Sequence, residues 1–238
     1  MREKGIDTVL DERRQQRRRT MPKPFEELGQ IGLVPVITVN RPRDAVPLVR
    51  ALLQGGVACA EITFRTPSAE EAIRRICAEC PEMLIGAGTV LTVQQAEQAV
   101  QAGAQYIVSP GFDTFVVDWC QEHRVPVLPG VVTPTEINMA LARGLTWLKF
   151  FPAEEIGGVR MLKVLYAPYA EVRFIPTGGI TPHNLAQYLA LPNVVACGGS
   201  WMATESMLSE SKFDEIARVA GEARAIVRRV RGEGEGNR

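Results

Sequence analysis

Residues 57–88 read VACAEITFRTPSAEEAIRRICAECPEMLIGAG, and this stretch decides the fold. It opens with an apolar, β-rich run over 57–63, continues with an amphipathic helical pattern over 68–80, and ends with a second apolar run over 83–88. Two short apolar runs joined by a helix are typical of a β-α-β unit, in which the two strands lie parallel.

The same alternation extends in both directions along the chain. We predict further strands over 33–39, 105–109, 125–129, 146–151, 172–177 and 194–199, and helices over 43–55, 93–102, 113–123, 134–142, 157–166, 182–190 and 213–230. Eight strands, each followed by a helix, favour an α/β fold of the (β/α)8 TIM-barrel type with a single domain. A doubly wound sheet is the rival, but it places a glycine-rich phosphate turn after its first strand, and none follows 33–39.

The two ends of the chain depart from this pattern. Residues 1–23 are rich in arginine and show no apolar face, so we predict a basic, flexible arm before a barrel over 24–231 and a flexible tail over 232–238. An arginine-rich arm on a non-catalytic barrel that binds nucleic acid is one alternative. The 27 basic and 27 acidic residues of the whole chain argue against nucleic acid or an anionic membrane as the main partner.

The five cysteines and the hydropathy of the chain bear on its compartment. No signal-peptide pattern and no apolar run long enough to span a bilayer is visible, so we expect a reducing, cytoplasmic setting. The spacing Cys77-Ala-Glu-Cys80 lies inside a predicted helix, and a lone pair of this kind is weak support for a metal.

Three threonine–proline pairs mark predicted helix starts, at Thr66-Pro67, Thr133-Pro134 and Thr181-Pro182. In each pair the threonine hydroxyl is suited to cap the helix, and proline fits the first turn because its missing N–H has no partner there.

Lys149 lies at the centre of the apolar run TWLKFF and is one of five lysines in the chain. Side chains alternate between the faces of a strand, so Lys149 shares its face with Trp147 and Phe151. A charged ammonium is costly in an apolar interior unless it is paired. We therefore expect Lys149 either to form a buried ion pair or to serve as an amine that forms a Schiff base with a ketone.

Glu61 is the acidic counterpart, alone in the apolar run 57–63 and on the same face as Cys59 and Thr63. A partly buried carboxylate is suited to move protons, and it is also a natural ion-pair partner for Lys149. Two enzyme classes stay open at this point. One is a Schiff-base enzyme, and the other is an isomerase that uses Glu61 as a base without a covalent step.

Arg65 comes four residues after Glu61, just beyond the predicted strand. Its planar guanidinium matches a substrate carboxylate, whereas the alternative is a surface arginine paired with Glu70 or Glu71.

Glycine pairs follow the last two predicted strands, as Thr177-Gly178-Gly179 and as Gly198-Gly199-Ser200. Each pair precedes further helical or turn sequence, at the place where many barrels bind phosphate. We therefore predict a phosphate site there, with Thr177 and Ser200 as hydroxyl donors. The only histidines, His123 and His183, lie in or beside predicted helices, which argues against a metal-dependent enzyme.

Seven short stretches occur in this chain in the order EITFRT, GAGTV, SPG, LPG, KFFPAE, PTGGI and GGSW. Over residues 25–230 they resemble the bacterial 2-keto-3-deoxy-6-phosphogluconate (KDPG) aldolases, also called 4-hydroxy-2-oxoglutarate (KHG) aldolases. The resemblance implies a class I aldolase that needs no metal and no cofactor, is a homotrimer, and cleaves a phosphorylated keto acid to pyruvate and glyceraldehyde 3-phosphate, with KHG as a second substrate.

The resemblance also implies roles for individual residues. Lys149 would be the Schiff-base lysine, and Glu61 the general acid and base. Arg65 and Thr89 would bind the pyruvate end, and Pro110 and Phe151 would line the pocket. The residues implied for the phosphate are Thr177, Gly178, Gly179, Gly199 and Ser200.

Overall fold

The computed structural model describes residues 23–232, so nearly all of the predicted basic arm and of the predicted tail lies outside the described residues. The strands are β1 (Leu33–Ile37), β2 (Cys59–Thr63), β3 (Leu84–Gly88), β4 (Tyr106–Val108), β5 (Val127–Leu128), β6 (Gly130–Val131), β7 (Trp147–Phe150), β8 (Arg173–Pro176) and β9 (Cys197–Gly199). The helices are α2 (Lys23–Ile31), α3 (Ala45–Gln54), α4 (Ala69–Glu79), α5 (Val93–Gln101), α6 (Thr114–Glu122), α7 (Pro134–Ala142), α8 (Gly158–Tyr166), α9 (Leu185–Leu189), α10 (Glu205–Ser209) and α11 (Phe213–Arg231), with 3-10 turns η1 (Pro42–Asp44) and η2 (Glu154–Ile156).

The strands pair in parallel and form two curled sheets. One sheet has the order β5-β4-β3-β2-β1-β9, and the other has the order β6-β7-β8. Isolated parallel bridges join Phe174 to Val194 and Thr177 to Gly198, which brings the end of β8 beside β9. The predicted alternation of strands and helices in an α/β fold with a parallel sheet is therefore confirmed.

The predicted fifth strand, 125–129, differs from the observed structure because it is interrupted at Pro129. β5 ends at Leu128 and β6 begins at Gly130. Proline has no N–H to give to a sheet, so a strand that contains it loses one rung of its ladder. The Pro129 carbonyl still accepts a hydrogen bond from the Lys149 N–H at 3.0 Å, which joins this segment to β7.

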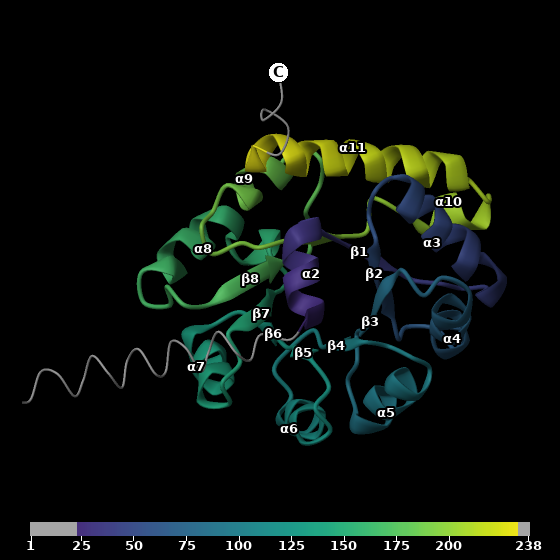
Figure 1. Ribbon diagram of the computed structural model, residues 1–238. Helices are drawn as coiled ribbons and strands as arrows, with labels where there is room; N and C mark the ends of the chain where they lie inside the picture. Colours follow the sequence, from purple (N-terminus) through teal and green to yellow (C-terminus); the bar gives the residue numbers. More distant parts are fainter. Residues whose placement is uncertain (1–22, 233–238) are drawn as a thin grey trace, which may run out of the picture.

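The helices lie around the outside of the strands, and α11 runs along one side of the molecule from α9 to α3 (Figure 1). Side chains of α11 such as Ile216 and Val227 are buried in the hydrophobic core. The contact with α3 is close because Gly55 sits against Ala220, where an added Cβ would meet the Ala220 Cβ at 2.6 Å. The helices thus cover the outer faces of the strands but not the ends of the strands.

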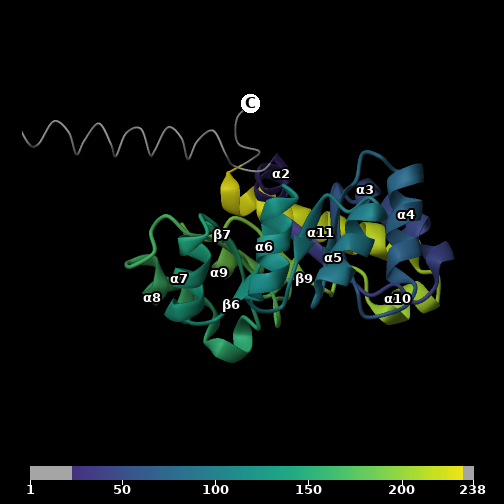
Figure 2. The same ribbon diagram turned by 90° about the horizontal axis from the view of Figure 1, so that it is seen from below.

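Helix α2 was not predicted, and it packs against the amino-terminal ends of the strands. Phe25 stacks on Trp147 at 5.9 Å between ring centroids and meets Tyr106 edge-on at 6.3 Å, while Leu28 is fully buried. Figure 2 shows α2 on one side of the strands and α10 on the other. A nine-residue helix is marginal alone, so it is this packing that stabilises α2 and leaves the carboxyl ends of the strands as the open side.

The helix predicted over 68–80 is confirmed as α4, but of the three predicted threonine caps only one is confirmed. Thr133 forms a full capping box with Glu136 at the start of α7. The Thr66 hydroxyl instead donates to the Val39 carbonyl at 2.6 Å, so it ties two loops together. The third helix begins only at Leu185, and the Asn184 carboxamide accepts from the Thr181 N–H. Within residues 23–232 no helix has the length and hydropathy needed to cross a bilayer.

Candidate active site

Lys149 and Glu61 meet in the interior between the sheets. Lys149 Nζ lies 3.0 Å from Glu61 Oε1, and the two side chains are only 6% and 3% exposed. The pair joins β7 to β2, which lie in different sheets and are not neighbours. Both side chains are therefore buried, and the ion pair, one of the two alternatives left open for Lys149, is present. Because such a pair stabilises a fold less than apolar side chains of the same volume, its presence favours a chemical role.

The backbone beside Glu61 is shaped to hold its carboxylate. A Cβ at Gly88 would overlap Glu61 Oε1, so only glycine leaves room for the carboxylate above β3. The next residue, Thr89, has φ of 55°, which is a costly conformation for a β-branched residue. Strain of this kind costs about 1–3 kcal/mol and is concentrated at functional sites. Thr89 directly follows the glycine that leaves room for the carboxylate.

A cavity of about 320 Å³ lies at the carboxyl ends of the strands. Seven of the predicted site residues line it, namely Arg65, Phe151, Thr177, Gly178, Gly179, Gly199 and Ser200. Phe151 connects this space with the ion pair, because Lys149 Nζ lies 5.4 Å from the centre of its ring. Lys149, Glu61, Thr89 and Pro110 do not line the cavity itself.

Pro110 lies close to the lysine through β6. A Cβ on Gly130 would overlap the Pro110 carbonyl, and Gly130 is the register partner of Lys149 on the neighbouring strand. Pro110 is therefore linked to the strand of Lys149 through Gly130, and it is not among the residues that line the cavity.

Arg65 is exposed and points its charge at the cavity. Glu70 and Glu71 both bind Arg74, at 2.5 and 2.7 Å, so the alternative that Arg65 pairs with them on the surface is wrong. Among the lining residues that the structure describes, Arg65 is the only cation. It is the one side chain there with a charge to offer an anionic group of a ligand.

The far end of the cavity is made of backbone and hydroxyl groups. Gly178 and Gly179 have φ of 101° and 73°, a conformation that favours glycine. A Cβ at Gly179 would overlap Glu154, whose carboxylate accepts a hydrogen bond from the Tyr188 hydroxyl. Burial raises the pKa of that hydroxyl, and the Glu154 bond raises it further.

Two N–H groups at this end are free to bind a ligand. Among the residues described, the N–H groups of Gly179 and Ser200, which lie outside the strands, donate to no backbone carbonyl. The helix predicted over 182–190 is shorter than expected, because α9 begins at Leu185 and a turn separates it from Gly179. The N–H groups at this end of the cavity therefore belong to the turns themselves rather than to a helix end.

Sequence reasoning missed several lining residues, among them Val36, Thr38, Thr63, Thr204 and Glu205. Strand parity was the available signal for Thr63, which shares the face of Glu61. Thr38 lies just beyond β1, at the end of the strand predicted over 33–39, and Glu205 is the first residue of α10, a helix that was not predicted.

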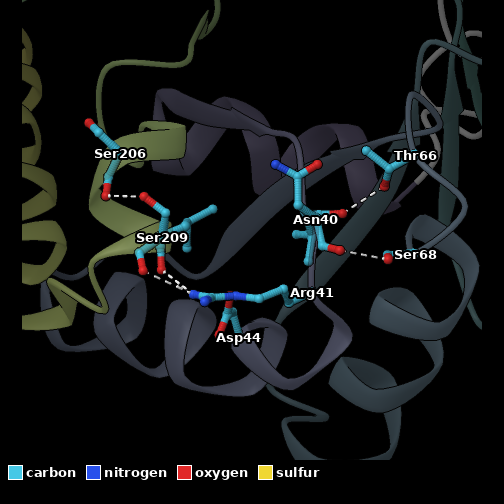
Figure 3. Close-up of polar contacts among 9 residues, drawn as sticks. Asn40, Arg41, Asp44, Thr66, Ser68, Ser206 and Ser209 are labelled. Atoms are coloured by element: carbon cyan, nitrogen blue, oxygen red, sulfur yellow. Dashed lines mark hydrogen bonds and ion pairs between the residues drawn. The ribbon is translucent and has the colours of Figure 1, made fainter.

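Arg41 links the connection after β1 to helix α10 (Figure 3). Its Nε pairs with Asp44 at 2.6 Å, and its Nη2 donates to the Leu208 carbonyl at 2.8 Å, at the end of α10. Because α10 begins at Glu205, this contact holds the outer wall of the cavity against β1.

The cysteines lie apart from the site or within the core. Burial raises the pKa of Cys120 to about 12 and also raises that of Cys77, whose thiol donates to the Gly103 carbonyl. No group of three or more metal-ligating side chains occurs in the part of the chain that the structure describes. The Cys77–Cys80 spacing belongs to the packing of α4.

The chain matches the family model described as "KDPG and KHG aldolase" over residues 26–219. This chain belongs to that family. Its members are aldehyde-lyases.

Individual family members resemble the chain over most of its length. The 2-dehydro-3-deoxy-phosphogluconate aldolase of Treponema pallidum (strain Nichols) is 51% identical over 203 residues, which cover 85% of this chain and 97% of that protein. The KHG/KDPG aldolase of Escherichia coli (strain K12) is 44% identical over 191 residues, covering 80% and 90%.

A solved structure extends the comparison to the fold. The KDPG aldolase of Legionella pneumophila, with pyruvate captured at low pH as a covalent carbinolamine intermediate, has a TM-score of 0.81 and is 36% identical. The matched region covers 86% of this chain and 98% of the Legionella chain.

Proposed function

We propose that this KDPG/KHG-family protein is a class I aldolase that cleaves KDPG to pyruvate and glyceraldehyde 3-phosphate through a Schiff base on Lys149. The observation that carries the proposal is the buried Lys149–Glu61 pair at 3.0 Å beside a cavity with an anion-binding far end. Covalent pyruvate in the Legionella relative supports an amine as nucleophile.

The first steps form the covalent link. Lys149 Nζ passes its proton to Glu61 and attacks C2 of the keto acid, which gives a carbinolamine. Glu61 then returns the proton to the C2 hydroxyl, water leaves, and an iminium ion remains on the lysine. The 3.0 Å contact lets one carboxylate serve in both directions.

The next steps break and repair the carbon chain. Glu61 accepts the proton of the C4 hydroxyl, the C4 oxygen forms its carbonyl, and the C3–C4 bond breaks. Its electron pair moves into the iminium, which becomes the enamine of pyruvate. After the aldehyde departs, C3 takes the proton held by Glu61, water adds at C2 of the resulting iminium ion, and hydrolysis frees pyruvate and Lys149.

The binding roles follow the layout of the cavity. Arg65 and Thr89 hold the carboxylate at the pyruvate end, and Pro110 and Phe151 flank the chain of the substrate. The phosphate lies at the glycine-rich turns, where Thr177, Gly178, Gly179, Gly199 and Ser200 surround it. Arg65 and the unpaired N–H groups of Gly179 and Ser200 support this orientation.

We propose the smaller keto acid KHG as a second substrate, cleaved to pyruvate and glyoxylate by the same steps. The name of the Escherichia coli relative, KHG/KDPG aldolase, supports it. KHG uses the reacting end of the cavity and leaves the phosphate end unfilled.

We also propose that the two sheets close into the eight-stranded barrel of a single domain over residues 24–231. The bridge of Thr177 to Gly198 and the Lys149–Pro129 hydrogen bond support closure, since they lie at the two junctions between the sheets. Cytoplasmic residence is supported by the five free cysteines. A crystal structure would test closure.

A homotrimer is the proposed assembly. Phe115 and Leu91 are 77% and 55% exposed, which supports a partner surface for these large apolar side chains. Light scattering of the purified protein at several concentrations tests the subunit number, and a stable monomer would contradict it.

Borohydride trapping tests the proposed chemistry. Sodium borohydride added with pyruvate is expected to leave a lactate-derived mass adduct on Lys149, mapped by peptide mass spectrometry. Lys149→Ala is expected to lose the adduct and at least roughly 10⁴-fold of kcat, because the covalent route is removed. Lys163→Ala, which removes a lysine from α8, serves as the control. An isomerase without a covalent step would give no adduct in any of these proteins.

A further inference from the structure

Thr38 is a cavity residue whose role the proposed aldol chemistry leaves open. It follows β1, it is half-buried, and its side chain lines the cavity together with Thr63. The other polar residues that line the cavity are Thr63, which Thr38 contacts, the residues with proposed binding roles, and Thr204 and Glu205 on its outer wall. A hydroxyl at this middle position faces the middle of a bound substrate.

The strand register gives its height above the reacting pair. Val36 pairs with Glu61, and Ile37 pairs with Ile62, so Thr38 lies opposite Thr63. Thr63 is two residues beyond Glu61 on the same face, which places the two hydroxyls about 6.6 Å nearer the mouth at 3.3 Å per residue. That is the level of the substrate carbons that follow the bond to be cleaved.

The hydrogen bonds of the two threonines set the direction of their protons. The Thr63 hydroxyl donates to the Ile37 carbonyl at 3.3 Å, and it lies 3.0 Å from the Thr38 hydroxyl. A threonine hydroxyl has one proton and two lone pairs. With the Thr63 proton on Ile37, Thr38 donates to Thr63 and keeps its own oxygen as an acceptor toward the cavity.

Hydrogen bonds from two neighbouring segments hold the backbone that directly follows Thr38 (Figure 3). The Thr66 hydroxyl donates to the Val39 carbonyl at 2.6 Å, and the Ser68 hydroxyl donates to the Asn40 carbonyl at 2.9 Å. Arg41 holds the next residue position against α10. An acceptor fixed in this way binds a donor with little loss of conformational freedom.

We propose that Thr38 is a specificity-determining residue that accepts a hydrogen bond from the C5 hydroxyl of the phosphorylated keto acid. In the direction of synthesis this is the hydroxyl next to the aldehyde carbon. The inference rests on the proposed function, and it predicts that the enzyme prefers an aldehyde phosphate with that hydroxyl over one without it. KHG carries no C5 hydroxyl, so its cleavage does not depend on Thr38.

The test compares two acceptors in the addition of pyruvate, D-glyceraldehyde 3-phosphate and 3-oxopropyl phosphate, which lacks the hydroxyl. The wild-type protein is expected to favour the first in kcat/KM by about fivefold, the size of one neutral hydrogen bond. Thr38→Val, which keeps the shape and removes the hydroxyl, is expected to lose this preference, and Thr38→Ser is expected to keep most of it. Thr38→Ala repeats the measurement in case valine packs badly.

Thr66→Val is the matched control, because it removes a hydroxyl that supports the same loop without lining the cavity. It is expected to lower kcat/KM for both aldehydes by the same factor and so to leave the preference intact. A preference that survives Thr38→Val and Thr38→Ala, or an equal loss on both aldehydes, would overturn the role of Thr38. Borohydride trapping of pyruvate by the same variants separates this outcome from failure of the proposed function, in which no variant and no wild-type protein would be trapped.

Discussion

The proposed reacting end of the site, which lies beside the cavity, and the far end of the cavity itself are built from different groups. The reacting end is a pair of charged side chains, Lys149 and Glu61, from strands in two different sheets. The far end is formed by Gly178, Gly179 and Ser200, where backbone turns and hydroxyls face the cavity. One end therefore depends on long-range packing, and the other depends on local backbone conformation.

This difference indicates how each end performs its task. Proton transfer and nucleophilic attack require groups that change charge, and such groups must be held at a fixed distance by the surrounding core. An anion that is only held in place is well served by N–H groups and hydroxyls, which do not titrate in the neutral range. Substitutions at the two ends should therefore alter different kinetic constants.

After Lys149→Ala, the largest effect is expected at the reacting end with Glu61→Gln. The amide keeps the shape but cannot take the C4 proton, so kcat for KDPG is expected to fall by ~10²–10⁴-fold. Steady-state assays of pyruvate release measure it. Glu205→Gln removes a carboxylate from the rim of the same cavity, and its kcat is expected to stay near that of the wild type. Wild-type kcat in Glu61→Gln would remove Glu61 from the proton transfers.

The second effect concerns stability, because the ion pair is buried. Lys149→Met leaves Glu61 without its cation and is expected to lower the free energy of unfolding by about 3–5 kcal/mol. The double variant Lys149→Met/Glu61→Leu is expected to recover that loss while remaining inactive, since an apolar pair of similar volume packs as well or better. Urea unfolding followed by circular dichroism gives both values. If the double variant were as unstable as the single one, the pair would be a structural requirement of the fold.

The smallest effect is expected at the far end with Gly179→Ala. Its φ of 73° and the overlap of a new Cβ with Glu154 would shift the turn, and backbone strain of this kind is worth about 1–3 kcal/mol. We expect KM for KDPG to rise by about fivefold, which corresponds to half of that strain acting on binding, with KM for KHG little changed. Gly111→Ala is the control, because an added Cβ there meets nothing within 4 Å. Equal changes for both substrates would mean that the turn does not bind phosphate.

Much of the site was predictable because its signals are local. The alternation of side chains placed Lys149 and Glu61 on inward faces, and the paired glycines marked the turns after β8 and β9. The capping box of Thr133 was also predictable, since its partner Glu136 is three residues away. Thr66 shows the limit of such reasoning, because its hydroxyl had a better acceptor in a loop distant along the chain.

The sequence alone therefore determined the order of strands and helices, the inward faces of β2 and β7, and the glycine turns, because periods of two and of about 3.6 residues are written in neighbouring positions. Only the tertiary structure decided that Lys149 meets Glu61, 88 residues away, that α2 packs against one end of the strands, and that Thr38 shares the cavity. These contacts depend on how far the sheets curl and on which loops meet at the mouth, and no local pattern along the chain encodes such distances.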